Sequence, residues 1–397
     1  MSKKKKVRVE LRKNREKPPR VNDITRDFAE GDGRADDAQS GERVRAKGNL
    51  SRYRTVMQNA SEAGTSMPAM DADACIRGRV LRVHGLASVV ETDDGRVFRC
   101  AVRRLLKSLA TDERSVVTTG DVVWILPTGT GVRKAEAPAE SDAEPTADSA
   151  AAPVHEGVIE RVEPRHGVLT RASRRREHVL VANVDQLVIV MSLVEPDLKP
   201  HLIDRYLAVA QQGGLNPVLC LNKSDLADAV ELQSLIGLYA QLGIPVLLCS
   251  ARTGFGIERL REHLHGRSTV FSGQSGVGKS SLLNAIQPDL ALAVKSVSEV
   301  NQKGRHTTTY SQLIKLNFGG WVVDTPGVRQ LQLWSARPEE MEGFFPEFRP
   351  FVPLCTFPDC THTHETRCAV KDAVARRTIT SRRYHSYIGL FNGTAEG

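Results

Sequence analysis

The chain has 397 residues, of which 40% are hydrophobic and 26% are charged, as is typical of a globular protein with two or three domains. No apolar run approaches the roughly 20 residues that a membrane helix needs. The N-terminal lysines are followed by further charge and not by an apolar segment, so we expect no signal peptide and a cytoplasmic location.

The net charge of +8 is concentrated at the N-terminus. Residues 1–20 contain ten Lys or Arg and two Glu, a surplus of eight that equals the net charge of the whole chain. Residues 1–74 show little hydrophobic periodicity, so we expect a basic and mostly disordered extension. Two interpretations of the basic arm stay open, a solvated tail without a fixed partner and a contact with nucleic-acid phosphates.

Short strands separated by tight turns are expected from Cys75 onward. They are predicted at residues 75–85, 87–92, 96–102, 120–126 and 156–162. The Asp-Asp-Gly sequence that follows the second strand is a hairpin signal. Five such strands predict a small β-barrel of the OB type at residues 75–172, with a sandwich fragment as the alternative. The Ala-, Pro- and acid-rich stretch 135–153 predicts a disordered insertion in the barrel or, alternatively, an interdomain linker.

Strands and helices alternate from about residue 178, and we place an α/β domain at residues 173–334. This order predicts right-handed crossovers and a parallel sheet. In such sheets ligands bind at the carboxyl ends of the strands, so functional loops should directly follow strands.

The segment GQSGVGKS has the phosphate-loop pattern G-x-x-x-x-G-K-[ST] between an apolar strand and a helix. Backbone N–H groups and the helix N-terminus would surround the phosphates. Lys279 would reach the β- and γ-phosphates, and Ser280 would bind Mg²⁺. The predicted nucleotide-binding residues of this loop are Gly273, Gln274, Ser275, Gly276, Val277, Gly278, Lys279, Ser280 and Ser281.

Two loops that precede the phosphate loop predict recognition of guanine. In LNKSDL, Asp225 would accept two hydrogen bonds from the guanine ring N–H and exocyclic amine, which adenine cannot offer. Asn222 would hold the loop and contact the base, and Lys223 would pack over it. The segment CSARTG resembles a second guanine-contacting loop, with Ser250 and Ala251 as the contacts.

The segment VVDTPG ends an apolar strand and supplies two further candidates. Asp324 would hold Mg²⁺, and the Gly327 N–H would contact the γ-phosphate. The segment NQKGRHTTTY suits a switch loop in which Thr308 binds Mg²⁺ when the γ-phosphate is present; Thr307 and Thr309 are alternatives.

The attacking water needs a residue that orients it. Val328 stands where many GTPases carry a glutamine, so another residue orients the water or the intrinsic rate is low. His306 is the nearby polar candidate, and a solvated loop histidine is an equal alternative. The candidate catalytic residues are therefore His306, Lys279 and Thr308.

A cysteine cluster occupies the C-terminal region, residues 335–397. Its C-x4-C-x-H-x5-C pattern predicts one structural Zn²⁺ held by three thiolates and an imidazole. The predicted ligands are Cys355, Cys360, His362 and Cys368. The alternatives are His364 as the imidazole ligand and three reduced cysteines without a metal.

The other four cysteines lie in apolar segments and are expected in the core: Cys75, Cys100, Cys220 and Cys249. The C-terminal tail mixes basic and aromatic residues, which suits RNA contacts. The alternative is an amphipathic helix that covers the zinc module with its charges solvated. The tail residues in question are Arg376, Arg377, Arg382, Arg383, Tyr384 and Tyr387.

These motifs and their order resemble the RsgA family of bacterial small-ribosomal-subunit biogenesis GTPases, also called YjeQ or EngC. The resemblance covers about residues 75–391 and rests on GQSGVGKSSLLN, GRHTTT, DTPG, NKSD and the cysteine pattern. Guanine loops before the phosphate loop match the circular permutation of that family. The basic arm, the acidic stretch and the sequence ETRC before the last cysteine depart from the family pattern.

The resemblance implies an OB-fold, a circularly permuted GTPase domain and a small zinc-binding α domain, with GTP or GDP, Mg²⁺ and one Zn²⁺. It implies a late role in small-subunit maturation, ribosomal RNA binding in the GTP-loaded state and release on hydrolysis. It also favours His306, because the histidine of GRHTTT has been implicated in hydrolysis. We expect no membrane partner and a monomer when free. The alternative, which Val328 keeps open, is a guanine-nucleotide-regulated RNA-binding or chaperone module with incidental turnover.

Overall fold

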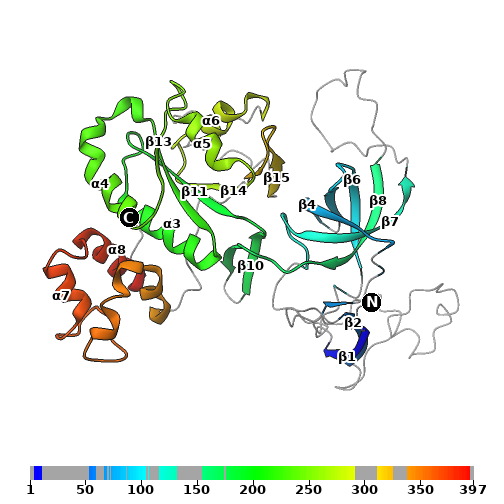
Figure 1. Ribbon diagram of the computed structural model, residues 1–397, viewed down its shortest axis with the longest axis horizontal. Helices are drawn as coiled ribbons and strands as arrows, with labels where there is room; N and C mark the ends of the chain where they lie inside the picture. Colours follow the sequence, from blue (N-terminus) through cyan, green and yellow to red (C-terminus); the bar gives the residue numbers. More distant parts are fainter. Residues whose placement is uncertain are drawn as a thin grey trace, which may run out of the picture. The chain divides into compact units, whose positions relative to one another are not determined.

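The chain divides into two compact units, Met1–Cys75 with Arg103–Asp112, and the remainder. Figure 1 shows the elements of the computed structural model. In the part of the chain that it describes, every helix is too short or too polar to span a membrane. The structure describes residues 4–10, 53–59, 67–68, 71, 73–85, 87–103, 106, 116–131, 154–173, 176–290, 311–324 and 338–393.

The first unit contains a three-stranded antiparallel sheet of β1 (Lys4–Glu10), β2 (Tyr53–Asn59) and β3 (Met67–Pro68). We predicted mostly disorder for residues 1–74, and these strands are the described exception. Most of that extension lies outside the described residues, so the expectation stays a prediction there.

Five strands of the second unit close into a barrel. They are β4 (Ile76–His84), β5 (Ala87–Thr92), β6 (Val97–Val102), β7 (Val122–Gly131) and β8 (Val154–Val162). Their order is β4-β5-β6-β8-β7, and β7 pairs back onto β4. Only the β6–β8 pair is parallel among these five strands. Closure confirms the predicted OB-type barrel and excludes the sandwich fragment.

The acidic stretch 135–153 lies between β7 and β8 and outside the described residues. Since β7 and β8 pair with each other, this stretch connects two strands of one barrel and does not join two domains. The four cysteines predicted in the core are buried: Cys75 directly before β4, Cys100 in the barrel, and Cys220 and Cys249 in the α/β domain.

The α/β domain is built on a sheet with the strand order β13-β12-β11-β14-β16-β15. The strands are β11 (Gln186–Ser192), β12 (Asn216–Asn222), β13 (Val246–Leu248), β14 (Ser268–Ser272), β15 (Gln312–Lys315) and β16 (Trp321–Asp324). Five strands run parallel, as predicted. The sixth, β15, is antiparallel because a short turn at residues 316–320 joins it to β16 in a hairpin. A separate hairpin, β9 (Leu169–Ser173) with β10 (Arg176–Val181), precedes the sheet.

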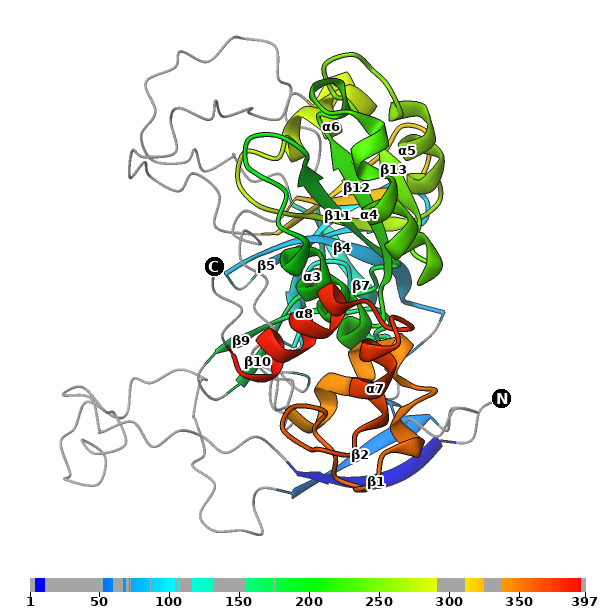
Figure 2. The same cartoon turned by 90° about the vertical axis from the view of Figure 1, so that its left-hand side faces the viewer.

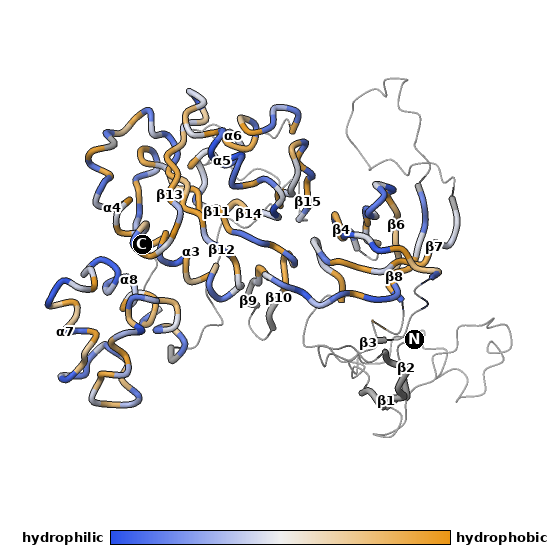
Figure 3. The backbone as a smooth tube through the Cα atoms, in the orientation of Figure 1, coloured by the Kyte–Doolittle hydropathy of each residue, from blue (hydrophilic) through white to orange (hydrophobic). Residues whose placement is uncertain are grey.

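Helices cover both faces of this sheet. On one face α3 (Pro200–Gly213) and α4 (Ala229–Gln241) share a hydrophobic core with alternate residues of β11. On the other face α5 (Ile257–Leu264) and α6 (Lys279–Ile286) pack on the intervening β11 residues. Every residue of β11 is therefore buried, and the central strands are the hydrophobic segments in Figure 3.

The C-terminal region is a small helical module. It contains the short 3₁₀ helices η7 (Pro338–Phe344), η8 (Pro346–Phe348) and η9 (Val352–Leu354), followed by α7 (Ala369–Ala375) and α8 (Ser381–Phe391). Its core includes Phe345, Phe348 and Tyr387, together with Ala208 from α3. The views in Figures 1 and 2 agree that α8 lies beside α3.

Candidate nucleotide site and metal centre

The predicted nucleotide loops meet at one edge of the sheet. Asn222 is the last residue of β12, Ser250 follows β13, Gly273 follows β14 and Asp324 ends β16. These four strands are parallel, so their carboxyl ends lie on the same side. The phosphate loop comes late in the chain, but the strand before it still places it beside the other nucleotide loops.

The phosphate loop ends where α6 begins. Gly278 has φ +91°, and a Cβ atom there would lie 2.4 Å from Nδ2 of Asn222, so only glycine fits. Within the described residues, no side chain caps α6, which leaves its first N–H groups to an anion. The Lys279 ammonium donates to the carbonyls of Gly273 at 2.8 Å and Gln274 at 2.6 Å, so it lies folded over the loop.

One buried amide joins the phosphate loop to the guanine loops. The Asn222 side chain is 2% exposed. Its Nδ2 donates to the carbonyl of Val277 at 2.8 Å, and its Oδ1 accepts from the N–H of Ala251 at 3.3 Å. Three segments that are distant in sequence are thus held together by a single side chain.

The two guanine loops also contact each other. A hydrogen bond from the Ser250 hydroxyl lowers the pKa of the exposed Asp225 carboxyl, which favours the ionised form that can accept two hydrogen bonds from guanine. Lys223 has a left-handed backbone with φ +61°, and its ammonium donates to the carbonyl of Glu195. The Ser250 hydroxyl accepts from the N–H of Thr253 at 3.1 Å, which shapes the second loop.

The structure describes little of the predicted switch segments. His306, Thr308, Gly327 and Val328, together with the alternatives Thr307 and Thr309, lie outside the described residues. Asp324 is placed only by its backbone at the end of β16. Ser280 lies partly buried in the first turn of α6.

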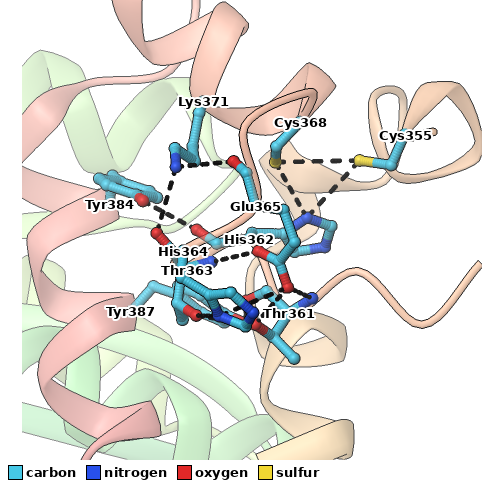
Figure 4. Close-up of polar contacts among 10 residues, drawn as sticks. All are labelled: Cys355, Thr361, His362, Thr363, His364, Glu365, Cys368, Lys371, Tyr384 and Tyr387. Atoms are coloured by element: carbon cyan, nitrogen blue, oxygen red, sulfur yellow. Dashed lines mark hydrogen bonds and ion pairs between the residues drawn. The ribbon is translucent and has the colours of Figure 1, made fainter. Parts of the chain in front are cut away.

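The predicted zinc ligands converge in the C-terminal module. Figure 4 shows Cys355, His362 and Cys368 of this set. The ligand atoms of Cys355, Cys360, His362 and Cys368 all lie within 4.8 Å of one another. Cys355 Sγ is 3.9 Å from Cys368 Sγ, and His362 Nδ1 is 3.6 Å and 3.4 Å from these two sulfurs. Zn–S and Zn–N bonds of usual length would give tetrahedral edges of about 3.8 Å and 3.6 Å, so the spacing suits Zn²⁺.

The chemistry of this cluster also favours a cation. Burial raises the pKa of the Cys360 thiol to about 12, and the neighbouring thiols oppose its ionisation further. A divalent cation would offset both effects. His364, the alternative ligand, is not among the residues whose ligand atoms converge, and 81% of its side chain is exposed.

Two tyrosines of α8 hold the ligand loop. The Tyr384 hydroxyl donates to the carbonyl of His362 at 2.8 Å, and the Tyr387 hydroxyl donates to that of Thr361 at 2.6 Å. The Glu365 carboxylate accepts from the N–H groups of Thr361 at 2.8 Å and Thr363 at 3.0 Å. The loop conformation therefore depends on several contacts besides the ligands themselves.

The tail helix differs from the RNA contact that we expected for it. Tyr387 is 1% exposed and Arg383 is 2% exposed, so neither is available to RNA, and that prediction was wrong for both residues. Tyr387 packs in the core of the C-terminal module, as the amphipathic-helix alternative predicted. That alternative expected solvated charges, so it was wrong for Arg383, which is buried and contacts Asp204 of α3. Arg376, Arg377 and Arg382 are exposed, and for them RNA contact stays a prediction.

Sequence reasoning missed three partners of these sites. Glu195 contacts Lys223, Glu342 contacts His362 and Asp204 contacts Arg383. Each is distant in sequence from the residue that it contacts, and none belongs to a recognisable motif. No local pattern in the sequence pointed to them.

Comparison with known proteins gives a consistent result. The sequence profile of the RsgA GTPase family matches residues 162–334. A small ribosomal subunit biogenesis GTPase RsgA from Sodalis glossinidius is 38% identical over 325 residues, covering 80% of this chain and 86% of the relative. One from Chlorobaculum tepidum is 38% identical over 329 residues, covering 81% and 99%.

Two solved structures share the fold. YjeQ from Thermotoga maritima matches with a TM-score of 0.61 and 34% identity, covering 81% of this chain and 99% of that protein. YloQ, described as a circularly permuted GTPase, matches with a TM-score of 0.58 and 27% identity, covering 82% and 97%.

Proposed function

Because the chain belongs to the RsgA family of GTPases, we propose that it hydrolyses GTP as an assembly factor of the small ribosomal subunit. The observation that carries this proposal is the Asn222 side chain, which joins the phosphate loop to both guanine loops. A site that combines phosphate binding with guanine recognition is what a GTPase requires, and the permuted chain order leaves it intact.

The nucleotide would be held by the residues that these loops bring together. Lys279 would leave the carbonyls of Gly273 and Gln274 and donate to the β- and γ-phosphates. Mg²⁺ would be held by Ser280, Thr308 and Asp324, and its charge would offset that of the phosphates. His306 would orient the attacking water in place of the glutamine that Val328 replaces.

The cysteine cluster would hold one Zn²⁺ with a structural role. Four protein ligands complete a tetrahedron, which leaves no position for a water or a substrate. Elemental analysis of protein purified without a chelator should find about one zinc per chain. A zinc-free protein with an intact C-terminal module would contradict this part of the proposal.

The partner would be the small subunit and its ribosomal RNA, bound in the GTP-loaded state and released after hydrolysis. The exposed Arg376, Arg377 and Arg382 supply positive charge for phosphate contacts on the zinc module. We propose that the free protein is a monomer and acts in the cytoplasm, where such subunits are assembled.

The test is GTP turnover with and without purified small subunits, with Lys279→Ala as the inactive control. We expect small subunits to stimulate the turnover of GTP. We expect no comparable turnover when ATP replaces GTP as the substrate. If small subunits bind but leave turnover unchanged, the alternative of an RNA-binding module with incidental hydrolysis is correct. If ATP is the better substrate, the assignment of the guanine loops is wrong.

A further inference from the structure

His362 uses both nitrogens of its imidazole ring. Nδ1 faces the sulfurs of Cys355 and Cys368 at 3.6 Å and 3.4 Å. Nε2 points the opposite way and lies 2.8 Å from Oε2 of Glu342. A neutral imidazole that offers the Nδ1 lone pair to a metal carries its proton on Nε2, and this proton needs an acceptor.

We propose that Glu342 is a positioning residue of the zinc centre: its carboxylate accepts the Nε2–H of His362 and so holds the ring with Nδ1 toward the metal. This inference rests on the zinc site proposed above. Carboxylates that orient metal-bound histidines in this way lower the freedom of the ring and raise its basicity as a ligand.

The surroundings of His362 make this contact important. Its side chain is 0% exposed and packs edge-on against Phe348, with Tyr387 on another side. Two aromatic rings cannot satisfy a buried N–H as a carboxylate does. The backbone of His362 is left-handed with φ +58°, so the loop sets the direction of its Cβ atom. The contact with Glu342 then sets the orientation of the imidazole ring.

The contact also joins two parts of the module. Glu342 belongs to η7, the first described element after the D-x-x-G segment, whereas His362 lies in the ligand loop. Since η7 is a short 3₁₀ helix, its position depends on contacts with the rest of the module. Zinc bound to His362 would therefore steady η7 through Glu342.

The test compares Glu342→Ala and Glu342→Gln with Glu340→Gln in the full-length protein. Glu340 is exposed in the same helix, so this control removes the same charge. Zinc affinity is measured by competition with a chromophoric chelator, and backbone hydrogen exchange of η7 is followed with and without zinc.

We expect Glu342→Ala to weaken zinc binding about 10- to 100-fold. Glu342→Gln should weaken zinc binding less, because an amide oxygen still accepts the hydrogen bond. Glu340→Gln should leave zinc binding unchanged. Zinc should protect η7 from exchange in the native protein and in Glu340→Gln but not in Glu342→Ala. If Glu342→Ala does not fold, weaker zinc binding by Glu342→Gln than by Glu340→Gln supports the proposal.

The role of Glu342 would be overturned if the Glu342 variants that fold bound zinc as tightly as Glu340→Gln and if zinc protected η7 equally in all of them. Failure of the zinc site itself gives a different result. In that case the native protein does not compete with the chelator at all, and Cys355→Ser changes nothing.

Discussion

Arg383 of α8 and Asp204 of α3 form an ion pair in which both side chains are buried, with 2.7 Å between Nη1 and Oδ1. Glu347 accepts from Nε of Arg383 at 2.6 Å, and the Tyr239 hydroxyl donates to Asp204 Oδ1 at 2.8 Å. The guanidinium also lies over the Phe345 ring at 4.4 Å. One arginine thus joins the zinc module to the GTPase domain.

Arg383→Met should destabilise the protein strongly. Removing one partner of a buried ion pair leaves the other charge without compensation, which typically costs about 3–5 kcal/mol. Burial alone would lower the pKa of Arg383, but the carboxylates of Asp204 and Glu347 raise it above its ordinary value, so the guanidinium stays charged. Urea unfolding of the protein with zinc in the buffer measures the effect.

The exposed neighbour supplies the control for this experiment. Arg382→Met removes the same charge from the same helix and should change the unfolding free energy by less than about 0.5 kcal/mol. Combining Arg383→Met with Asp204→Asn should recover part of the loss, because one of the two carboxylates left without a partner is then neutral, while Glu347 stays unpaired. Equal effects of Arg382→Met and Arg383→Met would contradict the structural role of this pair.

The burial of Arg383 and its pairing with Asp204 could not be predicted from the sequence. The spacing of Arg383, Tyr387 and Leu390 is that of one helix face, and α8 buries all three. Composition alone led us to expect RNA contacts on that face, because an arginine beside tyrosines looks the same whether solvated or buried. The partner Asp204 lies 179 residues away, and only the folded chain brings it close.

The nucleotide loops were predictable for the opposite reason. Each motif directly follows an apolar strand, and parallel strands place their carboxyl ends together whatever their order in the chain. What could not be predicted is β15, whose antiparallel direction follows from the hairpin turn to β16. Glu342 was also missed, since a glutamate in a polar segment carries no signal that it faces a metal ligand.

Asn222→Ala should weaken GTP and GDP binding alike. The change removes two buried hydrogen bonds that hold the phosphate loop and the second guanine loop in place. A loss of about 1–3 kcal/mol corresponds to roughly 5- to 150-fold weaker binding. Calorimetric titration with both nucleotides measures it. Asn216→Ala, at the exposed start of the same strand, should bind normally; a similar loss there would point to general destabilisation of β12.

Asp225→Asn should change which base is preferred. The asparagine amide cannot accept both guanine donors, but it can donate to the second carbonyl of xanthine. We expect binding of GTP to fall and binding of xanthosine triphosphate to rise, measured by competition with a fluorescent nucleotide. Asp228→Asn is the matched control, because Asp228 caps α4 and asparagine caps equally well. Unchanged preference in Asp225→Asn would remove Asp225 from the base contact.

Asp94, in the predicted hairpin turn, provides a test of pH dependence. Its carboxylate accepts from the Arg96 guanidinium at 2.8 Å, the Thr92 hydroxyl at 2.5 Å and the Arg96 N–H at 3.2 Å. These hydrogen bonds lower the pKa of Asp94 below its ordinary value, and the one from the Arg96 side chain has the largest effect. Stability from such a group is present above the unfolded pKa, about 3.9, and is lost as the pH falls through the folded pKa.

Asp94→Asn should therefore lower the thermal midpoint at pH 7, and the difference from the native protein should shrink as the pH falls below about 3.9. If the proposed zinc is released in acid, its loss would affect both proteins equally and would not alter their difference. Asp93→Asn removes the same charge in the same turn but breaks only the exposed ion pair with Arg77 at 3.6 Å, so its effect should be smaller. A carboxyl titration by NMR that gave Asp94 a pKa at or above 3.9 would contradict this account, because the turn would then not favour the ionised form.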